Sequence, residues 1–224
     1  YKPLINGMGE YSLNFILAFL NPVDLPESDE AFAEAFDWLL YRLVEGKGRI
    51  GGEGILPEEL GKFISGLVEV GKDSIIYNPF AGFASFGVTT PSEATYIGQE
   101  INIEIWAQGI LRRIAYGRKN GQIMQGDSLN DWPSNTKFDL IISAPPFGKI
   151  RTFDHSYDLS IKSCDEFVVK RGIESLRPEG KLVVLIPNSF LFNAGAYLAL
   201  RKSLITRDLI EKIISLPTCI LPNT

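Results

Sequence analysis

The chain has 224 residues, 45% of them hydrophobic and 22% charged, a composition typical of a globular protein large enough to bury a full core. It contains no run of about 18 apolar residues, which excludes a membrane span, and its single histidine, His155, excludes a histidine-rich metal centre and disfavours a Ser/His/Asp triad. The formal net charge of −5 lacks the basic surplus that usually drives phosphate binding, so a nucleic-acid substrate would need a further segment or another polypeptide for much of its affinity.

The first fifty residues are predicted to be helical, with helices at 12–20 and 29–46. In the second, apolar side chains recur at helical spacing, at Phe32, Ala35, Phe36, Leu39, Leu40 and Leu43. Glycines over 46–54 predict a boundary or a mobile loop. We therefore expect a helical N-terminal segment over 1–50 and an α/β domain over 51–224.

From there on, short β runs alternate with helical stretches. The predicted strands are 74–77, 94–98, 122–125, 138–143, 181–186 and 209–215, and the predicted helices are 57–70, 101–117, 164–176 and 194–206. Apolar strands alternating with helices predict a doubly wound, mostly parallel sheet covered on both faces. Ligands of such sheets bind beyond the carboxyl ends of the strands.

The stretch "NPFAGFASFG" (78–87) follows the first of these strands and predicts a nucleotide-binding loop. Gly82, Ala84 and Gly87 are spaced G-x-A-x-x-G, and Glu100 ends the next strand 18 residues after Gly82. Small residues let the backbone approach a ligand, and an acid after the second strand can accept hydrogen bonds from both hydroxyls of a ribose. A tight turn followed by a solvated glutamate is the structural alternative.

Three ligand classes compete for this loop. It has no lysine, which disfavours a P-loop nucleoside triphosphatase. A nicotinamide dinucleotide fits the spacing. S-adenosylmethionine, which needs ribose and adenine contacts but no phosphate cradle, is favoured by Asn78-Pro79 at the start of the loop and by Asp127 after the third strand. Asp127 is placed to accept from an adenine amino group, or alternatively only caps a turn.

The fourth strand ends in "SAPPF" (143–147), on the same edge of the sheet. Pro145 and Pro146 fix the backbone and lack N–H groups, so they hold Ala144 extended and present carbonyls rigidly. Phe147 offers a face for stacking. Such an arrangement suits a base extruded from a helix, whereas a strand terminator would explain the prolines alone.

From about residue 54 onward the chain resembles the methylation subunit of type I restriction-modification systems, an N6-adenine DNA methyltransferase. The resemblance rests on "NPFAGFASFG", "YIGQEIN" (96–102), "QGDSL" (125–129), "FDLIISAPPFG" (138–148), "LRPEGKLVVLIPNSFLF" (176–192) and "IISLPTCILPNT" (213–224). It implies the S-adenosylmethionine-dependent methyltransferase fold and that cofactor, no metal, and as partners DNA, a specificity subunit and a restriction subunit. The N-terminal helices resemble a trimmed form of that family's helical domain.

Carried over onto this sequence, the resemblance implies two sets of site residues. The catalytic tetrapeptide is Ala144, Pro145, Pro146 and Phe147. The cofactor-binding residues are Leu56, Pro57, Asn78, Phe80, Ala81, Gly82, Ala84, Ser85, Glu100, Asp127 and Ser128. Leu56-Pro57 stands where Thr-Pro is usual in the family.

Ala144 is the main departure, because the family's tetrapeptide begins with Asn or Asp. In the family that side-chain oxygen and a proline-side carbonyl accept the two N6 hydrogens of adenine, and loss of one such preorganised bond typically slows a reaction about 10²–10³-fold. Ser143 is expected to point to the opposite face of the strand. Ala84 stands where a second glycine is common and fits if its φ is negative. Asn78 in place of an aspartate can still accept a hydrogen bond.

Several alternatives stay open at this stage. The chain could be a degenerate subunit that binds cofactor or partners without transfer, an active enzyme with compensation, or one with an engineered substitution. Related enzymes methylate adenine in ribosomal RNA or glutamine amides in proteins. Cys164 and Cys219 lie far apart without a CxxC, which predicts reduced thiols and a cytoplasmic protein. The chain begins without Met and ends just after the sixth predicted strand, so a fragment is expected.

Overall fold

The computed structural model describes residues 29–46, 55–148, 150, 161–217 and 220. The predicted helix at 12–20, the predicted boundary at 47–54 and Cys219 lie outside the described residues. Cys164 is a free, buried thiol. Within the described ranges, no helix combines the length and the apolarity needed to cross a lipid bilayer.

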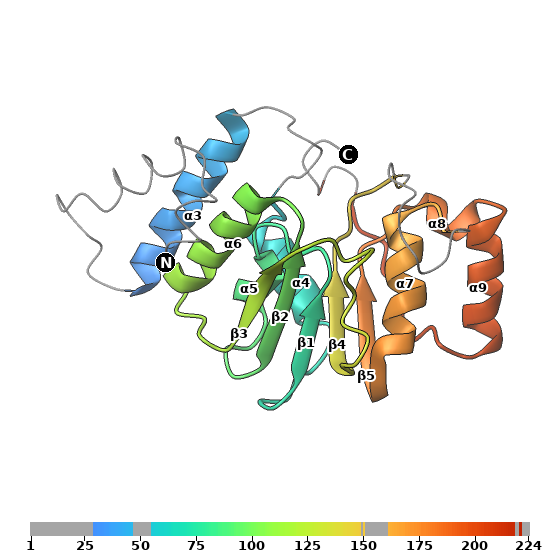
Figure 1. The fold of residues 1–224 in the computed structure, drawn as a ribbon. Helices are drawn as coiled ribbons and strands as arrows, with labels where there is room; N and C mark the ends of the chain where they lie inside the picture. The colour runs from blue at the N-terminus through green and yellow to red at the C-terminus, as the bar shows by residue number, and fades with distance from the viewer. Residues whose placement is uncertain (1–28, 47–54, 149, 151–160, 218–219, 221–224) are drawn as a thin grey trace.

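A five-stranded sheet forms the centre of the molecule (Figure 1), and it confirms the predicted doubly wound fold. Its order is β3-β2-β1-β4-β5, and every neighbouring pair is parallel. The strands are β1 (Ile75–Asn78), β2 (Thr95–Glu100), β3 (Gly121–Gln125), β4 (Phe138–Ser143) and β5 (Leu176–Val184). The buried residues of β1 and β4 are mostly apolar, apart from Asn78 and Ser143 at the strand ends, as expected for central strands covered on both faces.

Helices cover the two faces of the sheet in separate groups. One face carries α4 (Glu58–Ser65), α5 (Ser85–Thr89) and α6 (Ile103–Ala115), which pack on strand residues such as Ile76 and Leu140. The other face carries α7 (Cys164–Ser175), where Phe167 and Val168 pack against Tyr77 and Ile141. The outer helices are α3 (Asp29–Gly46), which packs on α6, and α8 (Ser189–Phe192) and α9 (Ala196–Thr206), which flank α7 (Figure 1).

Side-chain caps explain where the two long covering helices begin. Asn102 Oδ1 accepts from the backbone N–H groups of Glu104 (3.0 Å) and Ile105 (3.3 Å) at the start of α6. Ser163 Oγ accepts from the backbone N–H of Glu166 (3.4 Å) at the start of α7. Each cap satisfies donors that a helix leaves without an internal partner.

The strand order creates one switch point, between β1 and β4. The chain leaves β1 towards β2 and β3 on one side, and then returns to place β4 on the other side of β1. Connections therefore diverge at the carboxyl ends of β1 and β4, which is where doubly wound sheets bind ligands.

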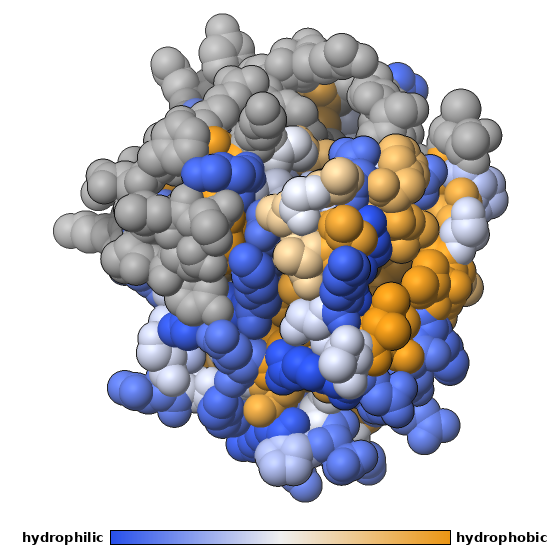
Figure 2. Space-filling model, turned by 90° about the vertical axis from the view of Figure 1, so that its right-hand side faces the viewer, coloured by the Kyte–Doolittle hydropathy of each residue, from blue (hydrophilic) through white to orange (hydrophobic). Residues whose placement is uncertain are grey.

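Several sequence-based elements differ in the structure: β5 spans 176–184 instead of the predicted 181–186, and α5 and α8 were not predicted. The sixth strand, predicted at 209–215, is wrong: these residues form neither helix nor strand, and Leu209, Ile210, Ile213 and Ile214 are exposed. The segment is tied to β5 by an ion pair of Lys181 with Glu211 (2.6 Å) rather than by a strand ladder. Figure 2 looks onto the α9 side of the molecule, where apolar side chains lie exposed among hydrophilic ones.

The helix predicted over 57–70 is also shorter, because α4 ends at Ser65 and Gly66 caps it. Gly66 donates its backbone N–H to the Lys62 carbonyl (2.9 Å) and Leu67 donates its own to the Ile64 carbonyl (3.2 Å), and the chain then turns away from the helix axis. The next apolar residues, Leu67, Val68 and Val70, continued the sequence pattern without continuing the helix.

Candidate active site

The carboxyl ends of the strands surround a cavity of about 240 Å³. Its walls come from the residues before α4, the loop after β1, the end of β2, the turn after β3 and the tetrapeptide after β4. All the predicted site residues line it except Pro57 and Ala84, namely Leu56, Asn78, Phe80, Ala81, Gly82, Ser85, Glu100, Asp127, Ser128, Ala144, Pro145, Pro146 and Phe147. Their roles remain predictions, but the structure brings them to one place.

The loop after β1 is held in shape by Asn78. This buried side chain accepts from the backbone N–H of Phe80 (3.2 Å) through Oδ1 and donates through Nδ2 to the hydroxyl of Tyr96 (3.1 Å). On the outer side of the loop, Gly109 lets α6 approach closely, since a Cβ there would lie 2.9 Å from the Gly82 carbonyl oxygen. Gly82 itself has a positive φ of 53°, and a Cβ on it would meet nothing within 4 Å. The backbone at Gly82 is therefore bare towards open space.

Glu100 is the buried acid of the cavity. Its carboxylate accepts from the backbone N–H of Gly82 (2.9 Å) and from that of Asn102 (2.8 Å), so it joins the end of β2 to the loop after β1. Burial raises the pKa of the Glu100 carboxyl above its ordinary value, and the backbone hydrogen bonds oppose that rise. Each carboxylate oxygen has a second lone pair, so both can still accept from a ligand.

Asp127 and Ser128 form the wall after β3. Asp127 accepts from the backbone N–H of Leu129 (3.0 Å) and from the side-chain amide of Asn130 (2.9 Å), so it caps this turn while its half-buried carboxylate lines the cavity. The buried hydroxyl of Ser128 donates to the carbonyl of Pro79 and ties the turn to the loop after β1.

The tetrapeptide after β4 forms the opposite wall. Pro145 is buried, whereas Phe147 is 42% exposed and lines the cavity instead of packing into the core. Ser143, just before the tetrapeptide, is fully buried. Its side chain does not line the cavity, so it supplies no acceptor there in place of the one that Ala144 lacks.

Ala84 differs from the expectation of a negative φ. Its backbone is left-handed, with φ 59° and ψ 33°, just before α5, and its side chain is fully buried behind the loop. An L-residue with a Cβ pays roughly 1–2 kcal/mol for this conformation. The family's usual glycine would occupy it without strain.

Replacing Ala84 with glycine is therefore expected to stabilise the fold by about 0.5–1 kcal/mol, because relief of the left-handed strain exceeds the loss of one buried methyl group. Thermal unfolding should show a midpoint about 2 °C higher. As a matched control, Ala107→Gly removes an equally buried methyl from the middle of α6 and should destabilise the protein. A lower midpoint for Ala84→Gly would show that the strain is compensated.

Sequence reasoning missed several residues that line the cavity: Ile55, Pro79, Phe83, Phe86, Gln99, Ile101, Gly126 and Leu185. Ile101 and Leu185 follow the ends of β2 and β5, so the rule that ligands lie beyond the carboxyl ends of strands could have found them. Phe83 and Phe86 belong to the quoted loop, but their spacing gave no signal that separates a wall residue from a core residue.

The sheet order, the acid after β2 and the loop after β1 define an α/β methyltransferase fold. Solved structures support that class: the type I restriction-modification methyltransferase subunit from Streptococcus thermophilus superposes with a TM-score of 0.67 at 22% identity, covering 81% of this chain and 45% of that one. The EcoKI M protein gives 0.60 at 19% identity over 74% of this chain and 40% of that one. Residues 27–224 match the family model N-6 DNA Methylase, and the chain belongs to that family.

Curated relatives point the same way. The type I restriction enzyme MpnII methylase subunit of Mycoplasma pneumoniae is 22% identical over 95% of this chain and 46% of its own length. The MjaVIII methylase subunit of Methanocaldococcus jannaschii is 22% identical over 96% of this chain and 42% of its own length. The chain thus spans less than half the length of these two relatives.

Proposed function

We propose that this chain is the cofactor- and base-binding part of an S-adenosylmethionine-dependent N6-adenine DNA methyltransferase, the methylation subunit of a type I restriction-modification system. The observation that supports this proposal most strongly is that Glu100 and Asp127 line the same cavity as Pro145, Pro146 and Phe147. Membership of the N-6 DNA Methylase family supports the choice of adenine in DNA.

The residues present fit S-adenosylmethionine. The Glu100 carboxylate is buried and keeps lone pairs for two ribose hydroxyls, and Asp127 has acceptor oxygens for an adenine amino group. The bare backbone at Gly82 allows close approach of a ligand. When bound, the cofactor supplies an electrophilic methyl group on a sulfonium.

On the acceptor side, the chain's own groups would bind and orient an extruded adenine. The exposed face of Phe147 provides a stacking surface, and base–aromatic stacking contributes about 1–3 kcal/mol. The rigid backbone at Pro145-Pro146 offers carbonyls that can accept from the N6 amino group. Holding the nitrogen in line with the methyl group is the positional part of the catalysis.

The relatives that this chain resembles are subunits of type I restriction enzymes, so we propose DNA, a specificity subunit and a restriction subunit as its partners. Because a net charge of −5 gives little attraction for DNA phosphates, a further segment or the specificity subunit would supply most of the DNA contacts. DNA as the substrate would place this activity in the cytoplasm.

A second function is favoured by one residue. Because Ala144 carries no hydrogen-bond acceptor in its side chain, the chain could bind cofactor and assemble with its partners while transferring methyl groups slowly or not at all. In that case the cofactor side of the cavity would work without the acceptor side.

Calorimetry with S-adenosylmethionine and, separately, with NAD tests the proposal. We expect saturable binding of S-adenosylmethionine, none of NAD, and transfer of tritiated methyl to adenine in DNA when a specificity partner is present. Binding of NAD alone would overturn the assignment. Binding of S-adenosylmethionine without transfer would select the second function.

A further inference from the structure

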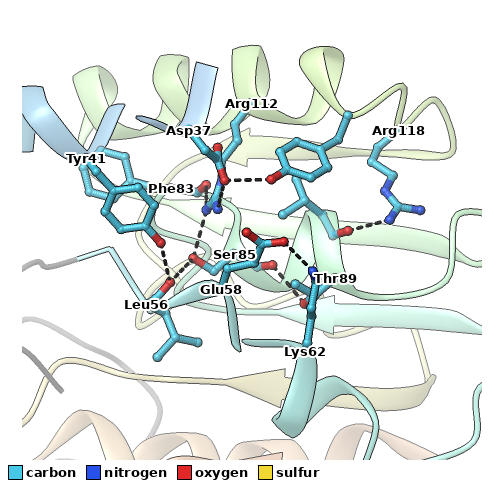
Figure 3. A network of polar contacts seen from close by, with 12 residues as sticks. Asp37, Tyr41, Leu56, Glu58, Lys62, Phe83, Ser85, Thr89, Arg112 and Arg118 are labelled. Atoms are coloured by element: carbon cyan, nitrogen blue, oxygen red, sulfur yellow. Dashed lines mark hydrogen bonds and ion pairs between the residues drawn. The ribbon is translucent and has the colours of Figure 1, made fainter. Parts of the chain in front are cut away.

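A buried ion pair links the outer helix α3 to α6, behind the cavity (Figure 3). Arg112 donates from Nε to Asp37 Oδ1 (2.7 Å) and from Nη2 to Asp37 Oδ2 (2.6 Å). Arg112 is fully buried and Asp37 is only 5% exposed. Tyr116 adds a hydrogen bond from its hydroxyl to Asp37 Oδ2 (2.8 Å). Burying such a pair seldom stabilises a fold more than apolar side chains of equal volume would.

The remaining donor of the guanidinium points at the loop after β1. Arg112 Nη1 donates to the carbonyl of Phe83 (3.3 Å) and to Ser85 Oγ (3.1 Å). These two residues flank Ala84, whose left-handed backbone is strained. Strained conformations persist when their surroundings over-determine them. Arg112 holds Phe83 and Ser85, the neighbours of the strained Ala84, by hydrogen bonds, and Asp37 holds the Arg112 guanidinium in place.

The same hydrogen-bond network extends to Leu56, which lines the cavity just before α4. The Leu56 carbonyl accepts from the hydroxyl of Ser85 (3.4 Å) and from the hydroxyl of Tyr41 on α3 (3.4 Å). Figure 3 shows both hydroxyls converging on this carbonyl. Ser85 Oγ therefore accepts from Arg112 and donates to Leu56, which directs its hydrogen bonds away from a ligand.

We propose that Asp37 and Arg112 are positioning residues of the cofactor pocket, which hold the Phe83–Ser85 turn and, through Ser85, the Leu56 wall in their binding shape. Neither residue lines the cavity. The helix α3 is then part of the cofactor site and not a separate covering segment. This inference rests on the proposed function, because the ligand it concerns is S-adenosylmethionine.

Asp37→Asn tests the inference. It removes the charge that anchors the guanidinium while keeping the size of the side chain. If the turn then adopts its binding shape only a tenth of the time, the apparent affinity falls tenfold, so we expect the Kd for S-adenosylmethionine to rise about tenfold or more. The Kd is measured by calorimetry well below the unfolding temperature of each variant, where a residue needed only for stability would leave it unchanged.

A matched control is Arg177→Ala, which breaks the ion pair of Arg177 with Asp139 (2.8 Å) outside the cavity and should leave the Kd unaltered. Ser85→Ala completes a double-mutant cycle with Asp37→Asn. The two effects should be non-additive if Ser85 acts through the network, whereas full additivity would mean that Ser85 contacts the cofactor independently, which overturns its positioning role.

The outcomes distinguish a failure of the proposed function from a failure of the positioning role of Asp37 and Arg112. If the unaltered protein does not bind S-adenosylmethionine, the proposed function fails. If it binds and Asp37→Asn binds equally well, the function stands and the inference is overturned. Should Asp37→Asn not fold, Tyr116→Phe decides instead, because it removes only the hydroxyl that donates to Asp37 Oδ2 (2.8 Å); a Kd raised about threefold or more supports the inference and an unchanged one overturns it.

Discussion

Replacing Ala144 with asparagine is expected to raise the rate of methyl transfer to adenine about 10²–10³-fold. The lone pair of the adenine N6 atom is delocalised into the ring, and acceptors on both N6 hydrogens help to localise it for attack. The backbone at Pro145 can supply one acceptor, but the alanine methyl supplies none. The neighbouring hydroxyl of Ser143 is fully buried, so it does not replace the missing acceptor.

Ala144→Val is the matched control, since it adds bulk at the same place without an acceptor and should not raise the rate. The measurement is tritiated methyl transfer to DNA with the specificity partner present, alongside the Kd for S-adenosylmethionine. Asparagine should change the rate and leave the Kd nearly constant. If the unaltered chain transfers methyl groups rapidly and Ala144→Asn is no faster, the absent side chain has no catalytic consequence and the second function is excluded.

Replacing Glu100 with glutamine is expected to weaken S-adenosylmethionine binding about 10- to 150-fold, the equivalent of losing one charge-assisted hydrogen bond of about 1.5–3 kcal/mol. The carboxylate also receives the backbone N–H groups of Gly82 and Asn102. If the NH₂ group of the glutamine faced either backbone N–H, two hydrogen-bond donors would oppose each other. The substitution would then disturb the loop after β1 as well as the ligand contact.

The pH dependence of S-adenosylmethionine binding tests whether the Glu100 carboxylate contacts the ligand. Burial raises the pKa of Glu100, so its carboxylate takes up a proton at a higher pH than the ordinary value of 4.5. The protonated group loses charge and acceptor strength, so binding by the unaltered protein should weaken as the pH falls through this raised pKa, before an ordinary glutamate would be protonated. Glu100→Gln should show little pH dependence, while the exposed Glu59→Gln should behave like the unaltered protein. Equal pH profiles for all three would remove Glu100 from the site.

The regular part of the fold was predictable because hydrophobic patterning is local. The runs that became β1 to β5 read as short apolar stretches, and α6 and α7 carried cap residues at their starts. The predicted strand at 209–215 failed because apolar alternation shows only that a segment suits a sheet. Whether a neighbour offers its backbone hydrogen bonds depends on tertiary arrangement, which no local pattern contains.

The site was predictable as a set of strand ends and less so in its internal contacts. Glu100 and Asp127 could be identified because each ends or follows a strand. The sign of φ at Ala84 could not be read from its identity, since it is set by the turn into α5. The Asp37–Arg112 pair joins residues 75 positions apart, and neither has a local signal that distinguishes it from a surface charge.

In the proposed function, the methyl donor and the base that accepts the methyl group would lie on opposite sides of the switch point between β1 and β4. Under the proposed function, residues at the ends of β1, β2 and β3 would hold the methyl donor, whereas the base would depend on the residues just after β4. One substitution just after β4 could therefore stop methyl transfer and leave the residues that would bind the cofactor unchanged. Ala144 stands at such a position, so under the proposed function a single substitution there would be enough to restore transfer.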